Sequence, residues 1–430
     1  MKFIDMFSGI GGFRTAMENN GHECIAYSEI DKHAIQSYQA MYNTENEIDL
    51  GDITNISQEY LSHFKKDNDM VVGGSPCQAF SVAGKQAGFE DTRGTLFFEY
   101  AKVVKETQPK YFLFENVKGM TSHDQGNTIR VVLETFNELG YYIDFNVFNS
   151  KYYGVPQNRE RIYILGKRKD LVEQPKYHDK TKGKKKFDEI HNWAVDNINY
   201  VELLPTLQTE VTTRLVDVLE DEVDEKYYLS DEKVEKLTLD NDLGGDKRIT
   251  MPVLTPDRLN KRQNGRRFKE DGEPMFTLTA EDRHGIAVRE ATKQGYAVAE
   301  QGDSVNVTFP TSKTRRGRVG KQVAQTLQAG EVNQGVVIDD TQGYDGVRYY
   351  KGIAPTLRSN RSGLKTIDKL RIRKLTPLEC WRLQGFTDEQ FYKAKNSGVS
   401  KSQLYKQAGN SVSVPVVDAI VKCLWSYQIL

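Results

Sequence analysis

Apolar runs alternate with amphipathic stretches along the first 170 residues of the chain. The short runs predict buried strands at residues 2–7, 22–28, 69–72, 111–114, 142–148 and 161–165. Apolar residues recur at helical spacing in the segments 13–20, 94–106 and 127–139. Strands and helices that alternate in this way predict an α/β domain built on a mostly parallel, doubly wound sheet.

The composition of the chain changes after about residue 170. A lysine-dense linker at Lys180–Lys186 is followed by an acidic stretch at 210–246 and a basic one at 247–321. A short sequence phrase built around Thr-Leu recurs here and is followed each time by a run that begins with glycine, at 275–288, 324–338 and 354–364. Residues 205–207 are a candidate fourth copy of the phrase alone. We interpret each copy as a small loop-and-strand unit, which predicts a smaller, β-rich second domain.

Helical patterns return in the last part of the chain. Thr376-Pro377 opens a helix within 371–386, because proline is favoured at the first helical position and Glu379 stands at the third. A further helix is predicted at 401–407, an interruption at 408–415 and a terminal apolar helix at 416–427. We expect the terminal helix to complete the first domain after the insert.

The length of 430 residues and the amino-acid composition fit a globular chain with two or three domains. A mean hydropathy of -0.61, without an apolar run near 18 residues, argues against a membrane span. The N-terminus enters a strand pattern at once, which argues against a signal peptide. The four cysteines, which form no C-x-x-C pair, indicate a reducing cytosol and no structural zinc site: Cys24, Cys77, Cys380 and Cys423. With a net charge of -1, the distribution of charge tells more about nucleic-acid binding than its sum.

One cysteine directly follows a predicted strand. The apolar run at 69–72 is broken by two glycines and Pro76, and Cys77 comes next. A thiol in such a turn would lie at the ligand-binding edge of an open α/β sheet, where its thiolate can act as a nucleophile. A lone cysteine is more often a small buried hydrophobe, so other residues must decide between the two interpretations.

A glycine-rich turn at residues 8–12 follows the first predicted strand. It lets the backbone approach a ligand closely, although Arg14 replaces the third glycine of a G-x-G-x-x-G pattern and argues against a dinucleotide pyrophosphate. Glu29, after the second strand, stands where a carboxylate would hold a ribose diol, and Asp52 could accept from an adenine amino group. An ordinary tight turn and solvated carboxylates are the alternatives.

Glu115 stands at the end of the predicted strand at 111–114. It and Cys77 are therefore expected to face one pocket from neighbouring strands. An apolar strand end would raise the pKa of this carboxyl group, so that it could donate a proton. Arg159 and Arg161 stand two residues apart at a strand start and are expected on the same face. The alternative for Glu115 is an exposed strand-end side chain.

Basic loops that contain glycine occur in the middle region, at 258–267 and 313–321. Such loops suit phosphate contacts, and we expect these contacts from Arg315, Arg316 and Arg318 in the second loop. Solvated loops are an equally good interpretation of either run taken alone.

These segments, in this order, resemble the motifs of the cytosine-C5 DNA methyltransferase family, in its bacterial restriction-modification form. The similar segments are Asp5–Phe13, Gly74–Gln78 with its Pro-Cys pair, Phe114–Val117, Gln157–Arg161, Arg373–Phe386 and Gln407–Pro415. The resemblance covers roughly residues 1–170 and 371–430. It implies the S-adenosylmethionine-dependent methyltransferase fold with a smaller, β-rich target recognition domain in the uncovered middle region.

The resemblance also implies a chemistry for the candidate residues. Cytosine C5 is a poor nucleophile until a thiolate adds to C6, and this role falls to Cys77. Glu115 would stabilise charge at N3 of the base, while Arg161, and with it Arg159, would hold O2 and the active-site carboxylate. The family uses S-adenosylmethionine as methyl donor and no metal, and flips its target base out of double-stranded DNA.

Further site residues follow from the same resemblance. The expected cofactor-binding residues are Phe7, Ser8, Gly9, Gly11, Gly12, Glu29, Ile30, Asp52, Ile53, Leu96, Asn410 and Val412. Gln78 and Ser81 are expected to contact DNA from a loop at 78–86 that closes over the flipped base.

We therefore predict a catalytic and cofactor-binding domain at 1–170, completed by 400–430, a target recognition domain at 171–371 and a connecting segment at 372–399. The protein is expected to be a monomeric, cytoplasmic bacterial enzyme that is associated with the nucleoid through DNA. It would protect host DNA from a cognate restriction endonuclease without contacting that enzyme.

Two alternatives stay open at this point. One is a tRNA cytosine methyltransferase with the same motifs, against which the insert of about 200 residues argues. The other is a dinucleotide-dependent oxidoreductase with Cys77 as a redox thiol, which the missing third glycine disfavours.

Overall fold

The computed structural model describes residues 1–76, 96–237, 252–254, 284–312, 314–329, 333–339 and 370–426. The chain divides into two compact units, Met1–Thr212 with Trp381–Leu430 and Thr213–Cys380. These limits differ from the predicted boundaries at 171 and 400, because the segment after residue 170 packs on the first unit. Tyr200 forms a parallel bridge with Ile143, and the Asn199 backbone N–H donates to Asn137 Oδ1 at 3.0 Å.

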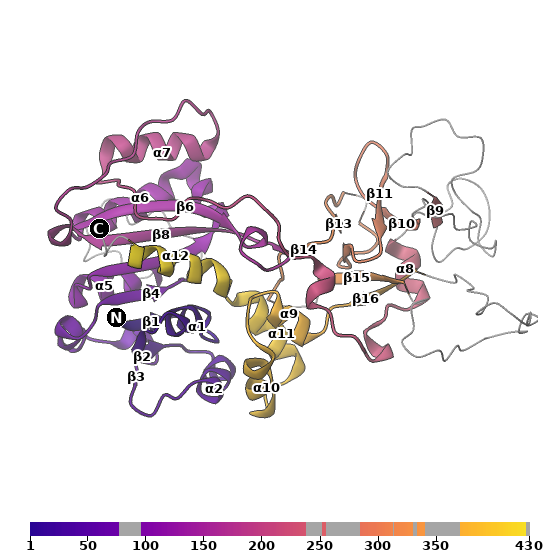
Figure 1. The fold of residues 1–430 in the computed structure, drawn as a ribbon, viewed down its shortest axis with the longest axis horizontal. Coiled ribbons are helices and arrows are strands. Elements are labelled where there is room, and N and C mark those ends of the chain that lie inside the picture. Colours follow the sequence, from indigo (N-terminus) through magenta and orange to yellow (C-terminus); the bar gives the residue numbers. More distant parts are fainter. Residues whose placement is uncertain are drawn as a thin grey trace, which may run out of the picture. The chain divides into compact units, whose positions relative to one another are not determined.

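A seven-stranded sheet forms the centre of the first unit, in the order β3-β2-β1-β4-β5-β8-β6 (Figure 1). Its strands are β1 (Lys2–Met6), β2 (Glu23–Ser28), β3 (Ile48–Asp49), β4 (Met70–Gly73), β5 (Tyr111–Val117), β6 (Tyr141–Asn149) and β8 (Glu160–Arg168). The first five in this order pair in parallel, and β8 pairs antiparallel with β5 and β6. The mostly parallel sheet predicted from the sequence is confirmed.

Helices cover both faces of this sheet. The helices of this unit are α1 (Gly12–Asn19), α2 (Lys32–Met41), α3 (Gln58–Ser62), α5 (Leu96–Thr107), α6 (Asn127–Glu138), α7 (Lys186–Asn197), α10 (Asp388–Asn396), α11 (Lys401–Asn410) and α12 (Val414–Ser426). Of these, α10 packs on α2, and α9 (Pro377–Arg382) lies where the two units meet in sequence. The crossovers from β1 to β2 and from β4 to β5 run in opposite directions across the sheet. Because such crossovers are right-handed, α1 and α5 lie on opposite faces.

The C-terminal helix completes the first unit, as expected. α12 packs against α1, and Asn20 Nδ2 donates to Asp418 Oδ1 at 2.8 Å. The preceding helix is longer than predicted, because Ala408, Gly409 and Asn410 still belong to α11 and the interruption begins only at Ser411.

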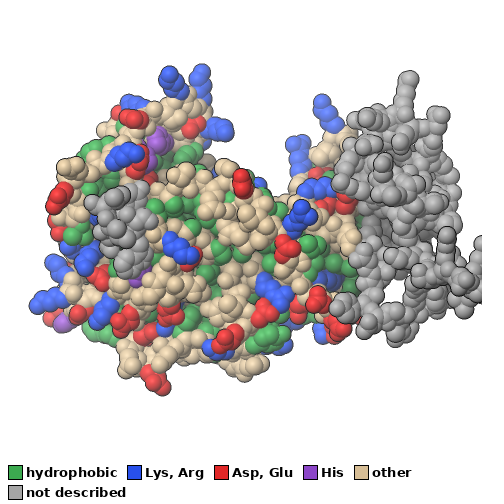
Figure 2. Space-filling view, viewed as in Figure 1, with side chains coloured by type: hydrophobic (Ala, Val, Ile, Leu, Met, Phe, Trp, Pro, Cys, Tyr) green, Lys and Arg blue, Asp and Glu red, His purple; other side chains and the backbone are tan. Residues whose placement is uncertain are grey.

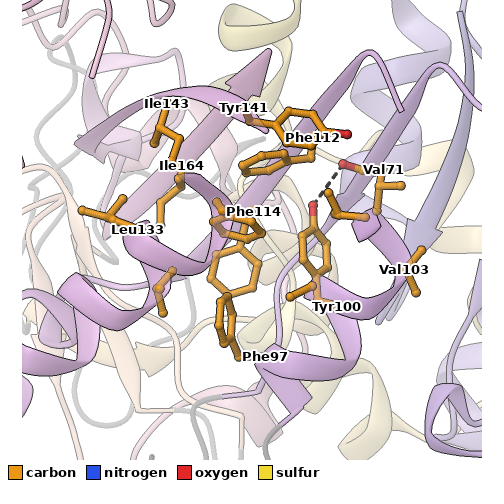
Figure 3. Close-up of a cluster of buried hydrophobic side chains, with 14 of the residues drawn as sticks. Val71, Phe97, Tyr100, Val103, Phe112, Phe114, Leu133, Tyr141, Ile143 and Ile164 are labelled. Carbon is orange, nitrogen blue, oxygen red and sulfur yellow. Dashed lines mark hydrogen bonds between the residues drawn. The ribbon is translucent and has the colours of Figure 1, made fainter. Parts of the chain in front are cut away.

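A large core cluster lies between the sheet and helices α5 and α6 (Figure 3). Phe112 on β5 and Phe136 on α6 stack with ring centroids 4.1 Å apart, and the Tyr100 hydroxyl donates to the Val71 carbonyl at 3.0 Å. Burial of each such side chain contributes about 1.5–3 kcal/mol to stability. This core holds the carboxyl ends of β4 and β5 in fixed positions.

The described residues of the second unit form two small antiparallel sheets. One has the order β11-β10-β9 and the other β13-β12-β15-β16. Their strands are β9 (Pro252–Leu254), β10 (His284–Arg289), β11 (Tyr296–Glu300), β12 (Ser304–Asn306), β13 (Val319–Gly320), β15 (Gln334–Asp339) and β16 (Leu370–Lys374). Val234 of α8 (Asp231–Leu237) packs into a core cluster with Ile286 and Val337. The β-rich character predicted for this part is confirmed.

The repeated phrases are borne out in part. The glycine-led runs of two copies form β10 and β15, and the second copy begins with the short strand β14 (Ala324–Gln325). The candidate copy at 205–207 forms no strand, and the phrases at 275–280 and 354–364 lie outside the described residues.

Candidate active site

A cavity of about 350 Å³ opens at the carboxyl ends of β1, β2, β4 and β5. The direction of strand succession reverses between β1 and β4, which is where open α/β sheets bind ligands. The lining residues come from 7–10, 28–34, 52–53, 74–76, 96, 115–117, 159–161 and 406–411. A cavity of this size is within the usual range of small-molecule sites, about 300–1,000 Å³.

Glu115 and Arg161 meet in the wall of this cavity. Glu115 on β5 stands opposite Tyr163 on β8, and Arg161 lies two residues earlier on β8, so both side chains are on one face of the sheet. Arg161 Nε lies 3.2 Å from Glu115 Oε1. Burial raises the pKa of the Glu115 carboxyl, and the charges of Arg161 and Arg159 partly offset that rise. Glu115 is therefore a buried group that can carry a proton, and it is not an exposed strand end.

The segment after β4 lies directly against Glu115. A Cβ atom on Gly74 would lie 2.6 Å from Glu115 Oε2 and 3.1 Å from the Glu115 carbonyl oxygen, so only glycine fits without displacing the carboxylate. Asn116 Nδ2 donates to the Ser75 carbonyl at 3.0 Å. The residues at the end of β5 thus fix the backbone that leads into Pro76 and, next in the sequence, Cys77.

Arg159 lines the same cavity but makes different contacts from Arg161. It precedes β8, and its guanidinium donates to the carbonyls of Gly409 at 3.3 Å and Ser411 at 2.7 Å. Burial, followed by repulsion from Arg161, lowers the pKa of Arg159 to about 10. Both arginines were expected to hold the carboxylate. Only Arg161 lies within ion-pair distance of it, and Arg159 instead holds the end of α11 at the cavity.

Another part of the cavity carries a carboxylate fixed by backbone groups. Glu29 Oε2 accepts from the Gly9 N–H at 2.8 Å, and Oε1 accepts from the N–H groups of Ile30 at 2.8 Å and Asp31 at 2.9 Å. The side chain of Ile30 is 73% exposed, which is unusual for isoleucine and leaves an apolar surface at the cavity wall.

Asp52 lies nearby on the same wall. Thr54 donates to Asp52 Oδ1 from its N–H at 3.0 Å and from its hydroxyl at 2.7 Å, and these bonds lower the pKa of Asp52. Its other oxygen accepts no hydrogen bond from the described part of the chain. The remaining expected cofactor residues that line the cavity are Phe7, Gly9, Ile53, Leu96 and Asn410.

Four residues expected at the cofactor do not line the cavity: Ser8, Gly11, Gly12 and Val412. A Cβ on Gly11 would lie 2.5 Å from the Tyr42 ring, and one on Gly12 would lie 2.7 Å from Val412 Cγ2. The Ser8 backbone N–H donates to the Ser28 carbonyl at 2.9 Å. The turn at 8–12 is therefore a packing element behind the cavity, and only its residues 9 and 10 reach the wall.

A further charged pair, which sequence patterns did not predict, lies in the cavity wall. Lys406 on α11 lies 2.6 Å from Asp31 Oδ2, at the start of α2. Asp31 also caps α2 by accepting from the N–H groups of His33 and Ala34. Because Lys406 and Asp31 are 375 positions apart, no local sequence pattern could have predicted the pair.

Three predicted site residues lie outside the described residues: Cys77, Gln78 and Ser81, together with the rest of the loop at 78–86 and the basic run at 258–267.

The three arginines expected at DNA differ in their surroundings within the second unit. Arg316 is exposed and Arg315 is half-buried, with its guanidinium carbon 5.6 Å from the Phe309 ring centre. Arg318 is fully buried, and its guanidinium donates to the carbonyls of Asn306, Thr308 and Phe309. Arg318 therefore holds the loop together, and its assignment as a phosphate contact is corrected.

The described ranges contain neither a metal-binding cluster nor a membrane-spanning helix. There, no three His, Cys, Asp or Glu side chains are grouped so that they could hold a metal ion. Within the same ranges, every helix is too short or too polar to span a bilayer.

Comparison with known proteins identifies the family. Residues 1–425 match the family described as C-5 cytosine-specific DNA methylase. The chain is 36% identical to the orphan methyltransferase M.SPRI of Bacillus phage SPR, over 98% of this chain and 97% of that protein. It is 34% identical to the type II methyltransferase M.HpaII of Haemophilus parainfluenzae, over 98% of this chain and 88% of that protein.

Two solved structures share the fold. A DNMT2 variant of Spodoptera frugiperda matches with a TM-score of 0.53 and 18% identity over 99% of both chains. A putative DNA modification methyltransferase encoded in an Escherichia coli prophage matches with a TM-score of 0.53 and 21% identity over 100% of both chains. Because the family match covers almost the whole chain, this protein belongs to the C-5 cytosine-specific DNA methylase family.

Proposed function

We propose that this DNA cytosine-5-methyltransferase transfers a methyl group from S-adenosylmethionine to C5 of a cytosine within a specific double-stranded DNA sequence. The observation that carries the proposal is the buried Glu115, ion-paired with Arg161, in a cavity that also includes Pro76. Cys77 follows Pro76 in the sequence. A carboxyl that can carry a proton, a guanidinium and a thiol are the groups that activation of a cytosine ring requires.

The cavity suits the cofactor that the family uses. S-adenosylmethionine supplies a methyl group bound to a positively charged sulfur. Glu29 would accept hydrogen bonds from the ribose hydroxyls, because its carboxylate is already held in the wall by three backbone N–H groups. Asp52 would accept from the adenine amino group through its second oxygen, and the exposed side chain of Ile30 would pack on the base.

The chain's own residues would then activate the flipped-out base. The Cys77 thiolate forms a bond to C6, and the electron pair of the C5–C6 double bond becomes available at C5. Glu115 donates a proton or hydrogen bond to N3, so that negative charge does not build up on the ring. Arg161 holds both O2 of the base and the Glu115 carboxylate. After methylation a base removes the C5 proton, and the C6–S bond breaks as the thiolate leaves.

The biological role is proposed from the names of the relatives. The proposal follows M.HpaII, which is named a type II methyltransferase, whereas M.SPRI is named an orphan methyltransferase, a kind that lacks a partner endonuclease. We propose that this enzyme protects host DNA from a cognate restriction endonuclease and acts as a monomer in the cytoplasm, with the second unit as its target recognition domain. Methylation-sensitive sequencing of DNA from cells that express it would give the target sequence. Digestion of that DNA by an endonuclease of the same specificity tests the protection.

A covalent trap tests the proposed chemistry. With DNA that carries 5-fluorocytosine at the target, the C5 substituent cannot leave, so the enzyme should form a denaturant-resistant adduct in the presence of S-adenosylmethionine. Cys77→Ser should form no adduct and should not methylate, because a hydroxyl is far less ionised than a thiol at neutral pH. Cofactor binding, measured by calorimetry, should stay close to that of the wild type.

Two outcomes would contradict this function. An active wild-type enzyme that forms no adduct would exclude the thiolate mechanism. Methyl incorporation into tRNA but not into duplex DNA would assign the enzyme to the RNA substrate.

A further inference from the structure

We propose that a lysine-rich loop of the first unit, residues 180–185 before α7, contacts DNA phosphates beside the target base. This inference rests on the proposed function and extends it to a second, sequence-independent contact surface. Lys182, Lys184 and Lys185 are exposed and form no ion pair with any residue that the structure describes, whereas Lys180 pairs with Asp196. Figure 2 shows Lys and Arg side chains projecting from the part of the surface that α7 occupies in Figure 1.

The lysine loop is held in place by α7. The Thr181 N–H donates to Asn192 Oδ1 at 2.8 Å, and Asn192 Nδ2 donates back to the Thr181 carbonyl at 3.0 Å. The Lys185 N–H donates to Asp188 Oδ2 at 2.8 Å. A Cβ on Gly183 would lie 2.3 Å from the same carboxylate, so the backbone passes directly over it. A surface that is ordered in advance loses less conformational entropy when it binds.

Contacts between helices locate this loop at the catalytic edge of the sheet. α6 begins at that edge, because it follows the carboxyl end of β5 through short 3₁₀ turns at Lys118–Thr121 and His123–Gly126. A Cβ on Gly126 would lie 3.5 Å from Lys186 Cε, so α7 starts beside the start of α6. Asn199, after α7, bonds to Asn137 at the end of α6. The two helices therefore run in the same direction. The loop passes along α7 from Lys180, which pairs with Asp196 near the end of the helix, so its last residues, 183–185, lie at the edge that carries Glu115.

The lateral distance suits a DNA contact. Phe187 of α7 packs on Phe145 of β6, with ring centroids 5.7 Å apart, so the start of α7 lies by the edge strand. β6 is two strands from β5, which corresponds to about 10 Å. Phosphates roughly three to six base pairs from the target lie at about 10–20 Å along the duplex. Lysine ammonium groups bind phosphate as point charges and need no particular base beside them.

Charge balance favours DNA as the partner. The whole chain carries a net charge of -1, so a polyanion must be met by local groups of unpaired cations. Two such cations, Lys184 and Lys185, lie at the end of an ordered loop, at the edge where the target base would enter.

The test compares two double variants with equal loss of charge. Lys184→Gln with Lys185→Gln removes the proposed contact. Lys65→Gln with Lys66→Gln removes two exposed lysines from the turn that leads into the start of β4, at the opposite edge of the sheet. Affinity for a duplex of about 30 base pairs that the wild type methylates is measured between about 50 and 200 mM salt. Thermal unfolding and S-adenosylmethionine binding check that both variants are folded.

We expect the loop variant to lose affinity roughly tenfold or more at low salt, and its salt slope to fall by about 2, at about 0.9 per phosphate. The loss should be equal on a scrambled duplex. It should shrink on one of two duplexes that each end about two base pairs beyond the target, one on either side, because that duplex lacks the flanking phosphates. The variant at the opposite edge should keep the wild-type slope. If a folded loop variant keeps the wild-type slope while the wild type methylates duplex DNA, this inference is wrong and the proposed function stands. If the wild type methylates no duplex DNA, the proposed function fails first.

Discussion

Arg161 Nε lies 3.2 Å from Glu115 Oε1, and the two side chains reach each other across an antiparallel strand pair inside an otherwise mostly parallel sheet. The reversal of β8 brings the first residues of one strand beside the last residues of the other. Burial raises the pKa of Glu115 and Arg161 limits that rise. The carboxyl therefore binds a proton more readily than an exposed glutamate, as a group that donates a proton to the base must.

Replacement of Glu115 by glutamine should reduce turnover by roughly 100- to 10,000-fold, the usual contribution of general acid catalysis. Glutamine keeps the shape and can donate a hydrogen bond, but it cannot transfer a proton to N3. DNA affinity should be kept or even increased, because a buried charge is removed. Single-turnover methylation measures the rate, and a DNA titration measures the affinity. If turnover stayed within a few-fold of the wild type, Glu115 would have only a structural role at the end of the strand.

Replacement of Arg161 by glutamine should move the pH dependence of methylation. Burial raises the pKa of Glu115 and the charge of Arg161 lowers it, so loss of Arg161 raises that pKa further. Since the protonated carboxyl is the active form, the wild-type rate falls as the pH rises through this pKa. The fall should come at a higher pH in the variant, although the maximal rate is lower.

A control for this shift lies on the same strand. Arg168, at the other end of β8, pairs with Asp170, and its replacement by glutamine should leave the midpoint unchanged. A midpoint that stays in place, or moves to lower pH, in the Arg161 variant would show that Glu115 is not the titrating group.

Gly74→Ala should reduce turnover more than it reduces stability. The added methyl group would lie 2.6 Å from Glu115 Oε2, so the carboxylate must move away from its position beside Arg161. Gly119→Ala is the matched control, because its nearest neighbour would be Val117 Cγ2 at 3.9 Å, an ordinary contact. Methylation rates and thermal unfolding temperatures of both variants test this prediction. If the Gly74 variant were as active as the Gly119 variant, the close contact with Glu115 would be refuted.

The arginines of the second unit should separate into two classes. Neutralising Arg315 and Arg316 should weaken DNA binding and reduce its salt slope by up to about 2, if each contacts one phosphate. Arg318→Met should instead destabilise the unit, because three backbone carbonyls lose their donor at about 1–3 kcal/mol each. Chemical denaturation and DNA titrations at two salt concentrations measure these effects. Unchanged DNA affinity after loss of Arg315 and Arg316 would mean that this loop faces away from DNA.

Much of the first unit could be predicted from local sequence patterns. The buried strands appeared as apolar runs, and Glu115 was correctly placed towards the end of one of them. Such predictions succeed because a buried strand is apolar in its own sequence. The family resemblance rested on short contiguous motifs of the same kind. Their order along the chain was sufficient to identify the family before any contact was known.

Only the tertiary structure decided which distant residues meet. The Arg159 guanidinium bonds to Ser411, 252 positions away, and Lys406 pairs with Asp31, 375 positions away. Arg318 appeared as one more cation in a basic loop, but in the fold its charge is enclosed by carbonyls. The lysine loop appeared as a linker until the contacts of α7 located its last residues, 183–185, at the catalytic edge. The periodicity of apolar residues indicates which face of a helix or strand is buried. The partners of a residue depend instead on how separate elements pack, and a local sequence pattern does not contain that information.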